Sequence, residues 1–154
     1  MRITVISSTG GHWTQLNEII KKINENKKKN DILYIVTEKN MILKNRNDIF
    51  FLKQQDRKNI LFFLTMISNT IKSLYYVLKH RPNYVISTGA GVTVPYLIFA
   101  KIFKSKIIFI ESFSKTRTPT ITGRIIYKFA DYFFIQWPTM QKIYPKAIYK
   151  GSLY

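Results

Sequence analysis

The chain has 154 residues, with 25 Lys and Arg against 8 Asp and Glu, no Cys and a formal net charge of +17. This length suits a single domain, residues 1–154, that can bury a core. An apolar content of 46% excludes a disordered basic tail. The lack of Cys excludes disulfide scaffolds, thiol catalysis and Cys-ligated zinc. Since the chain has two His in total, we expect no metal site and no cofactor.

Apolar runs of strand and helix character alternate along the chain. A β-branched run predicts a strand at 2–7, and Leu16, Ile19, Ile20 and Ile23 then share one helix face. Further strands are predicted at 32–37, 48–53, 84–87, 106–111, 132–136 and 147–151, and further helices at 60–78, 92–103, 121–130 and after Pro138. This order predicts one doubly wound α/β domain with a parallel, Rossmann-like sheet.

Three polar segments follow predicted strands. They are STGGH at 8–12, STGAG at 87–91 and ESFSKTR at 111–117. Ligands of doubly wound sheets bind at the carboxyl ends of the strands. We therefore expect these three segments to form the functional site.

The first segment has the properties of a phosphate-binding turn. After Thr9, Gly10 and Gly11 allow close approach of the backbone, and the following helix offers free N–H groups to an anion. The segment matches neither the Walker A pattern nor GxGxxG, and a simple tight turn is the alternative. His12 lies at the helix start, where the helix dipole disfavours its cationic form. His12 is thus either structural or a neutral group that can act as a base.

The second segment resembles a dinucleotide-binding loop in Gly89 and Gly91 alone. The third glycine position is Val94, and Glu111 is the one acid about 20 residues further on, so we exclude NAD binding. We expect this loop to pack against a phosphate or against another loop.

Glu111 ends an apolar strand in a basic part of the chain. After Asp56, the sequence contains two acids, Glu111 and Asp131. Two interpretations of Glu111 stay open. It forms an ion pair with Lys115 or Arg117, or it lies in a cleft and binds a substrate hydroxyl or acts as a base. We expect Asp131 to be the structural acid.

The helix predicted at 60–78 is apolar, but its uncharged run stops at Lys72, too early to span a bilayer. One face is expected to pack into the core, namely Phe63, Ile67, Ile71, Leu74 and Leu78. Apolar residues beyond that face, with bases around them, favour a helix at a membrane surface, and a fully buried helix is the alternative. The predicted membrane contacts are Phe62, Phe63, Met66 and Lys72. His80, after this helix, is expected to be exposed.

The charge of +17 also fits a nucleic-acid-binding domain. However, the sequence contains no helix-turn-helix, RRM or zinc pattern, and its bases are spread along the chain. We therefore expect an anionic membrane surface as partner and no nucleic acid. Since no signal peptide is visible at the start, we expect a peripheral protein on the cytoplasmic face of the membrane.

Five motifs carry a resemblance to a known family over almost the whole chain. They are STGGH (8–12), ISTGAGVTVP (86–95), IESFSKTRTPTITGR (110–124), ADYFFIQWP (130–138) and YPKAIYKGSL (144–153). The chain resembles the Alg-fourteen-like family, which includes bacterial PssD/CpsF-type polysaccharide proteins. The resemblance implies the amino-terminal, acceptor-side half of a split GT-B glycosyltransferase. A separate partner chain would supply the nucleotide-sugar-binding half.

The resemblance also implies a reaction. A sugar, N-acetylglucosamine or another hexose, would pass from a UDP-sugar to a polyprenyl-pyrophosphate-linked acceptor in capsule, exopolysaccharide or lipid-linked oligosaccharide synthesis. Glu111 or His12 would take the proton from the attacking hydroxyl. The residues expected to bind the acceptor pyrophosphate are Thr9, Gly10, Gly11, Gly89, Gly91, Ser112, Lys115 and Arg117.

Two further expectations concern the partner chain. Trp137, Pro138 and Tyr154 are the candidate contacts with it. An alternative to a catalytic role is a chain that recruits and activates a catalytic partner.

Lys115 stands where the family often has Arg, and Lys offers a point charge in place of a bidentate fork.

Overall fold

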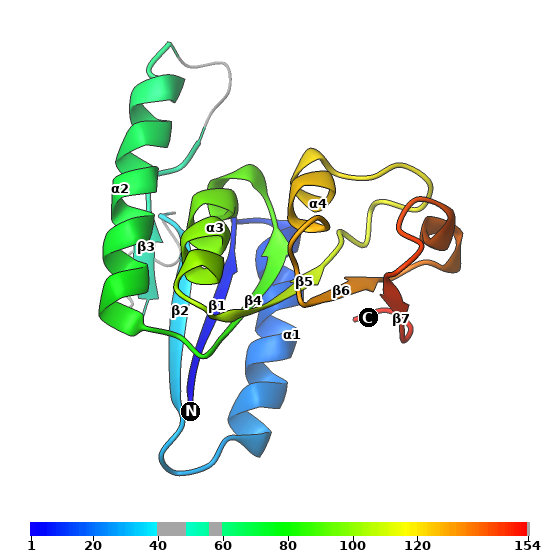
Figure 1. Ribbon diagram of the computed structural model, residues 1–154, viewed down its shortest axis with the longest axis horizontal. Coiled ribbons are helices and arrows are strands. Elements are labelled where there is room, and N and C mark those ends of the chain that lie inside the picture. Colours follow the sequence, from blue (N-terminus) through cyan, green and yellow to red (C-terminus); the bar gives the residue numbers. More distant parts are fainter. Residues whose placement is uncertain (40–48, 56–59, 154) are drawn as a thin grey trace.

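The computed structural model describes residues 1–39, 49–55 and 60–153. These residues form a seven-stranded sheet in the order β3-β2-β1-β4-β5-β6-β7, and every neighbouring pair is parallel (Figure 1). The strands are β1 (Arg2–Ser7), β2 (Ile32–Glu38), β3 (Ile49–Leu52), β4 (Tyr84–Gly89), β5 (Lys106–Ile110), β6 (Tyr132–Ile135) and β7 (Ile148–Tyr149). The order reverses between β1 and β4, so the switch point of the sheet lies between these strands.

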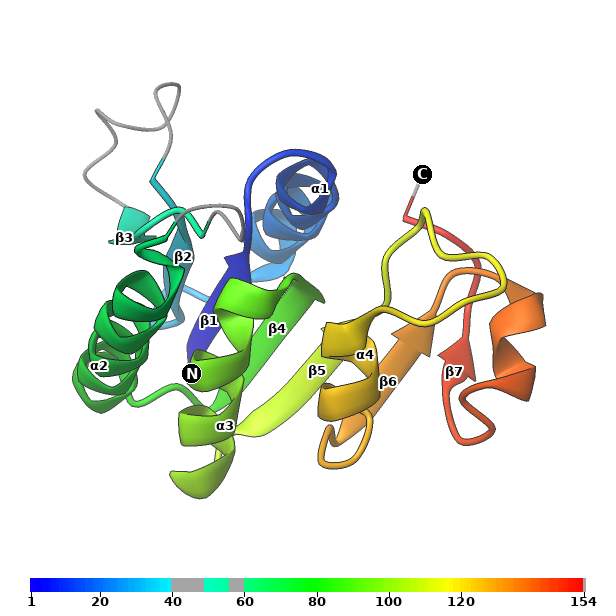
Figure 2. The same cartoon turned by 90° about the horizontal axis from the view of Figure 1, so that it is seen from above.

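Helices lie on both faces of the sheet. They are α1 (Gly11–Asn26), α2 (Phe62–His80), α3 (Val94–Ile102) and α4 (Ile121–Ile126), with 3-10 turns at Gly91–Thr93 and Pro138–Lys142. Figure 2 shows α1 on one face and α2, α3 and α4 on the other. The predicted doubly wound, Rossmann-like fold is confirmed.

The core has one part under each helix layer. Val5 and Leu16 belong to the part beside α1, and Ile6 and Phe109 belong to the larger part beside α2, α3 and α4. Neighbouring residues such as Val5 and Ile6 thus point to opposite, covered faces. This explains why the strands are continuous apolar runs without alternation.

Helix α4 is shorter than the range 121–130 predicted from the sequence. It ends at Ile126, and the carbonyl oxygen of Ile126 accepts hydrogen bonds from the backbone N–H groups of Phe129 and Ala130 at 3.0 and 2.8 Å. The first of these bonds spans three residues, so the chain tightens into a turn. The turn leads directly into β6.

Helix α2 contradicts the predicted core face. Phe63 and Ile71, expected inside, are 68% and 65% exposed, whereas Asn69 and Ser73 are fully buried. The physical reason is a hydrogen-bonded clamp, because the Asn69 side chain binds both the N–H and the carbonyl oxygen of Lys53 at 2.8 Å each. This clamp gives both backbone groups of Lys53, just after β3, hydrogen-bond partners on α2. The polar stripe of α2 therefore faces the sheet, and its apolar stripe faces outward.

His80 was expected to be exposed, and that expectation is wrong. The side chain is fully buried and its ring stacks between Tyr34 and Tyr76. Its Nδ1 lies 3.2 Å from the Tyr96 hydroxyl. Burial, assisted by the nearby Lys79 charge, lowers the pKa of His80 to about 4. His80 is thus a neutral core residue at pH 7.

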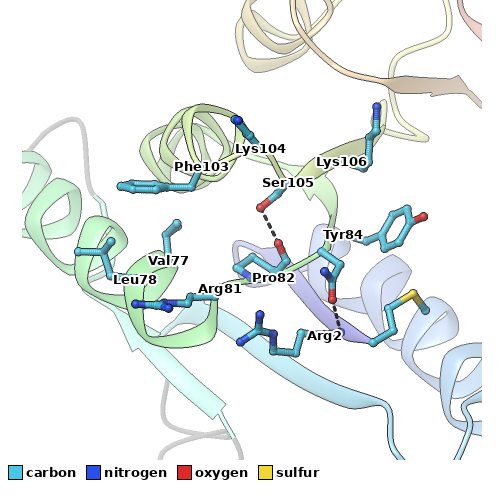
Figure 3. A pocket seen from close by; sticks show the side chains of 12 residues that line it. Arg2, Val77, Leu78, Arg81, Pro82, Tyr84, Phe103, Lys104, Ser105 and Lys106 are labelled. Carbon is cyan, nitrogen blue, oxygen red and sulfur yellow. Dashed lines mark hydrogen bonds between the residues drawn. The ribbon is translucent and has the colours of Figure 1, made fainter.

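At the amino-terminal edge of the sheet, α2 and α3 end beside the starts of β1, β4 and β5 (Figure 3). The loops there are tied together by two hydrogen bonds. Ser105 Oγ donates to the Pro82 carbonyl oxygen at 2.7 Å, and the Arg2 N–H donates to Asn83 Oδ1 at 2.8 Å. These bonds fix the loop 81–83 between β1 and β5.

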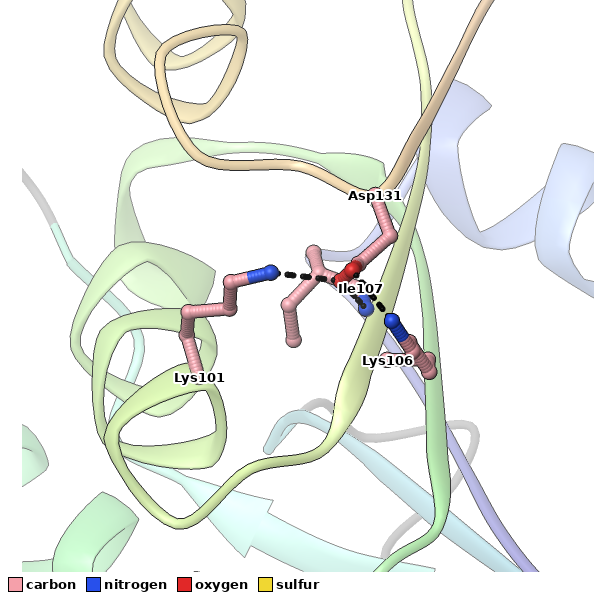
Figure 4. Close-up of polar contacts among 4 residues, drawn as sticks. All are labelled: Lys101, Lys106, Ile107 and Asp131. Atoms are coloured by element: carbon pink, nitrogen blue, oxygen red, sulfur yellow. Dashed lines mark hydrogen bonds and ion pairs between the residues drawn. The ribbon is translucent and has the colours of Figure 1, made fainter.

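Asp131 is a structural acid at the same edge, as the sequence indicated. Its carboxylate accepts hydrogen bonds from Lys101 Nζ at 2.7 Å, Lys106 Nζ at 3.0 Å and the Ile107 N–H at 2.8 Å (Figure 4). Burial opposes ionisation, but these hydrogen bonds outweigh it and lower the pKa of Asp131 to about 2. The carboxylate joins α3 to β5.

Candidate functional site

The three polar segments meet at the carboxyl edge of the sheet. They line one pocket of about 300 Å³. His12 comes from the segment after β1, Gly89 from the end of β4, Gly91 from the segment after β4, and Glu111 and Lys115 from the segment after β5. The pocket therefore lies at the switch point, where a ligand is expected in a doubly wound sheet.

The His12 ring has a fixed orientation. Its Nδ1 lies 2.6 Å from the carbonyl oxygen of Thr88, and the Thr88 hydroxyl donates to the His12 carbonyl oxygen at 2.9 Å. Because a carbonyl oxygen only accepts, Nδ1 must carry the proton. The neutral ring then has an unprotonated Nε2, which is the form required of a base.

Gly89 makes room for this ring. It has a φ of +101°, and a Cβ at this position would lie 3.2 Å from His12 Cε1. A side chain would therefore strain the backbone and press on the imidazole. This is why β4 ends in a glycine beside His12.

Glu111 is 1% exposed, and its carboxylate accepts four hydrogen bonds. The donors are the Ser112 N–H at 2.8 Å, the Thr120 N–H at 3.2 Å, the Thr120 hydroxyl at 2.8 Å and the Tyr144 hydroxyl at 2.8 Å. A carboxylate offers about four lone-pair sites, so this set uses its capacity. The partners are neutral groups and not Lys115 or Arg117. Glu111 thus fixes both ends of the loop that carries Lys115.

The hydrogen bonds of Glu111 with Thr120 and Tyr144, called here the Glu111 cluster, require a glycine at position 123. A Cβ on Gly123 would collide with the Glu111 carboxylate and lie 2.6 Å from the Tyr144 hydroxyl. The Gly123 N–H also donates to Thr120 Oγ1 at 2.8 Å, which caps α4. Burial, together with the bond to Glu111, raises the pKa of Tyr144, so its hydroxyl stays a donor.

Residue-by-residue reasoning missed four members of the site: Thr88, Thr120, Gly123 and Tyr144. Thr120 and Gly123 lie in the motif at 110–124, and Tyr144 opens the motif at 144–153. A Thr directly before a helix is an N-cap signal, and this signal points to Thr120. Thr88 orients the His12 ring through its backbone carbonyl oxygen, and a backbone group has no residue-type signal.

The predicted phosphate-binding residues do not all line this pocket. Thr9, Gly10 and Gly11 lie beside it, and a Cβ on either glycine would meet no atom within 4 Å. Gly10 has a φ of +72°, which favours glycine. The turn thus leaves open space at the start of α1.

Ser112 and Arg117 do not line this pocket either. The Ser112 hydroxyl is 3.0 Å from that of Ser114. Arg117 lines a different pocket, together with Arg124 and Lys128 on and after α4. Of the two bases predicted to bind the pyrophosphate, Lys115 is therefore the one in the pocket with His12.

Of the predicted partner contacts, Trp137 is half-buried and donates from Nε1 to the Phe113 carbonyl oxygen at 2.6 Å. Pro138 is exposed, and Tyr154 lies outside the described residues. The indole of Trp137 thus supports the loop after β5.

The predicted membrane contacts differ in exposure. Phe63 and Met66 are exposed, Phe62 is half-buried, and Lys72 is half-buried with Nζ 3.4 Å from the Phe51 carbonyl oxygen. Within the described ranges, no helix is both long and apolar enough to cross a bilayer.

Comparison with known proteins identifies the family. The family model described as "Oligosaccharide biosynthesis protein Alg14 like" matches residues 56–153, well over half of the chain. The chain belongs to the Alg14-like family. This confirms the resemblance that the sequence motifs indicated.

Relatives and solved structures extend the comparison. The chain is 31% identical over 101 residues to the mouse UDP-N-acetylglucosamine transferase subunit ALG14, covering 59% of this chain and less than half, 46%, of the mouse protein. MurG of Acinetobacter baumannii superposes with a TM-score of 0.70 at 16% identity, over 90% of this chain and 43% of MurG. UDP-GlcNAc 2-epimerase of Neisseria meningitidis superposes with a TM-score of 0.73 at 12% identity, over 99% of this chain and 47% of the epimerase. Both structures share the fold of this member of the Alg14-like family.

Proposed function

We propose that this chain is the acceptor-side subunit of a two-chain glycosyltransferase. The complex transfers a sugar, N-acetylglucosamine or another hexose, from a UDP-sugar to a polyprenyl-pyrophosphate-linked sugar. Family membership supports the proposal, because relatives are named as subunits of a UDP-N-acetylglucosamine transferase. The observation that carries it is the oriented His12 in the switch-point pocket.

The proposed step is an inverting transfer. The acceptor hydroxyl gives its proton to Nε2 of His12 as its oxygen attacks the anomeric carbon of the UDP-sugar. The bond from that carbon to the β-phosphate oxygen breaks, and UDP leaves with the electron pair. The 2.6 Å bond from Nδ1 to the Thr88 carbonyl oxygen stabilises the imidazolium that forms.

Glu111 has a different proposed task. Its four hydrogen bonds leave it unsuited to accept a further proton from a substrate. We assign it a positioning role, in which it holds the loop that presents Lys115 to the pocket. Lys115, with Gly10 and Gly11 at the start of α1, would then bind the acceptor pyrophosphate.

The outward face of α2 supports a lipid-linked acceptor. Exposed apolar side chains such as Phe63 and Ile71 run along this helix. From residue 57 to residue 110 the sequence contains no Asp or Glu. An apolar stripe without negative charge favours binding at an anionic membrane surface. We propose that α2 lies on the cytoplasmic membrane face as a peripheral contact.

A partner chain completes the proposed enzyme. The fold neighbours are about twice as long as the segment they share with this chain. We propose that residues 1–154 form one domain and that a second chain binds the UDP-sugar. Trp137 and Pro138, beside the loop that holds Lys115, are the proposed contacts with that chain, together with Tyr154.

The test is a reconstitution with a candidate partner chain, a small glycosyltransferase of the nucleotide-sugar-binding type. Labelled UDP-N-acetylglucosamine and UDP-glucose serve as donors, and an undecaprenyl-pyrophosphate-linked sugar serves as acceptor. The pair should transfer the label and either chain alone should not. His12→Ala should lower turnover by about 10²- to 10⁴-fold while the pair still forms.

The same assay separates the second candidate function, a chain that only recruits and activates its partner. The saturated carboxylate of Glu111 favours that alternative, because it removes one of the two candidate bases. If His12→Ala keeps the turnover of the unaltered pair, the recruiting role replaces the catalytic one. If no donor is transferred by the assembled pair, the glycosyltransferase proposal itself is wrong.

A further inference from the structure

A second pocket lies at the opposite edge of the sheet from His12. It has a volume of about 860 Å³ and lies between the ends of α2 and α3 and the starts of β1, β4 and β5 (Figure 3). Four basic side chains line it: Arg2, Arg81, Lys104 and Lys106. The proposed transfer reaction gives this pocket no task.

The charge in this pocket is largely uncompensated. Lys106 is paired with Asp131. Arg2, Arg81 and Lys104 form no ion pair within the part of the chain that the structure describes, and none of the residues lining the pocket is a carboxylate. Three unpaired cations around a concave surface attract an anion.

Two of these bases occupy backbone positions that favour glycine. Arg81, which ends α2, has a φ of +43°, and Lys104, just after α3, has a φ of +65°. The left-handed conformation is unfavourable for a residue with a Cβ, and helices commonly place Gly there. The dipole at a helix end favours a basic side chain. However, the helix dipole does not explain why these bases stand at left-handed positions. It also does not explain the basic side chain of Arg2, which lies at the start of a strand.

Exposed apolar side chains also line the pocket. Leu78 and Phe103 belong to its lining and are half or nearly half exposed, and Ile102 beside them is 65% exposed. Figure 3 shows Leu78 and Phe103 on the α2 and α3 side, with Arg81 and Arg2 below them. Basic side chains and exposed apolar side chains that line one pocket fit a ligand with a charged head and a hydrocarbon tail.

We propose that this pocket binds the phosphate headgroup of an anionic membrane phospholipid. Arg2, Arg81 and Lys104 contact the phosphate, and the acyl chains pass over Leu78 and Phe103 into the bilayer on which α2 lies. The inference rests on the membrane contact in the proposed function and adds a preference for one class of lipid. Arginine suits this task because its planar fork binds phosphate oxygens in pairs.

The test is sedimentation of the full chain with vesicles of phosphatidylcholine alone or mixed with phosphatidylglycerol. Unaltered protein should bind the mixed vesicles at least about ten-fold more tightly. The double variant Arg81→Gly with Lys104→Gly should lose this preference and still bind the neutral vesicles. Glycine suits both backbone positions, so loss of binding is not explained by misfolding.

Two controls make the result specific. Lys142→Gln with Lys146→Gln removes the same charge near β7 and should keep the lipid preference. If this control reduces it as much as the glycine pair does, the preference is general electrostatics and the proposed pocket is wrong. Ile71→Ser, on the outward face of α2, should weaken binding to both kinds of vesicle.

The outcomes of the vesicle experiment distinguish the headgroup pocket from the membrane contact of α2. If the unaltered protein binds both vesicles equally and Ile71→Ser weakens both, the α2 contact stands and the headgroup pocket is overturned. If the unaltered protein binds neither kind of vesicle, the membrane contact fails as well.

Titration with sn-glycerol 3-phosphate in the absence of vesicles tests whether the pocket binds a soluble phosphate. Binding of that probe together with no gain from phosphatidylglycerol would assign the pocket to a soluble phosphate and overturn the lipid proposal.

Discussion

The carboxylate of Glu111 and the hydroxyl of Tyr144 lie 2.8 Å apart inside the protein, although 33 residues separate them in sequence. Glu111 directly follows β5, and Tyr144 follows the 3-10 turn at Pro138–Lys142. The bond therefore ties the carboxyl-terminal part of the chain to the loop that carries Lys115. This tie makes the geometry of the pocket depend on residues far outside it.

Tyr144→Phe should destabilise the protein. The change removes the shorter of the two hydrogen bonds to Oε2 of the buried Glu111 carboxylate and leaves this oxygen the Thr120 N–H at 3.2 Å. Loss of such a bond to a buried charge costs about 1 to 3 kcal/mol in the free energy of unfolding. Urea denaturation monitored by circular dichroism measures the loss. Tyr75→Phe is the matched control, because the Tyr75 side chain is 57% exposed. Equal stability of both variants would contradict the role given to the Glu111 cluster.

Gly123→Ala should be more damaging than Gly11→Ala. A methyl group on Gly123 collides with Glu111 and Tyr144, whereas one on Gly11 meets open space at the start of α1. We expect a loss of about 2 kcal/mol or more at position 123 and little change in stability at position 11. Thermal unfolding of the two variants side by side is the measurement. A stable Gly123→Ala protein would show that the cluster can open without cost.

His80 should make stability fall as the medium becomes acidic. Its pKa is about 4 in the folded protein and about 6.5 in an unfolded chain. Since the unfolded state binds the proton more readily, the stabilisation is fully present above pH 6.5 and is lost between pH 6.5 and 4. The expected loss is about 2 to 3 kcal/mol. His80→Phe keeps an aromatic ring beside Tyr34 and Tyr76. In this variant the midpoint of urea denaturation should change less between pH 6.5 and 4 than in the unaltered protein. Unchanged pH dependence in the variant would assign the effect to other groups.

Asp131 should act in a lower pH window. Its folded pKa of about 2 lies below the ordinary value of 3.8, so its contribution is present above pH 4 and disappears as pH falls towards 2. Asp131→Asn should therefore cost about 1 to 2 kcal/mol at pH 7, a figure reduced because the two Lys partners are partly exposed. The difference between variant and unaltered protein should shrink below pH 4. A constant difference across that range would point to packing in place of charge.

The sequence predicted the fold because strand and helix signals alternate and both sheet faces are covered. Continuous apolar runs such as 2–7 and 106–111 are typical of strands that are covered on both faces, and such strands form a parallel sheet between helix layers. The orientation of α2 was not predictable in the same way. Periodicity shows that an apolar stripe exists, and the Asn69 clamp on Lys53, a contact between distant segments, decides which stripe faces the sheet.

The candidate site was also predictable only in part. His12, Gly89 and Glu111 were identified from their positions after strands, because parallel strands bring such residues to one edge. Their roles depend on partners that sequence spacing does not show. The carbonyl of Thr88 orients His12, and the hydroxyl of Tyr144 helps to saturate Glu111. The two candidate bases differ in their hydrogen bonds, and residue type alone does not distinguish them.

Helix α2 runs beside the strands from the edge that holds His12 to the edge that holds Arg81 (Figure 1). A helix lying flat on a bilayer would therefore set the strands flat as well. Both edges of the sheet would then stand at the same height above the lipid. The switch-point pocket would open sideways, along the membrane plane, and a lipid-linked pyrophosphate could reach it by lateral diffusion without leaving the headgroup layer.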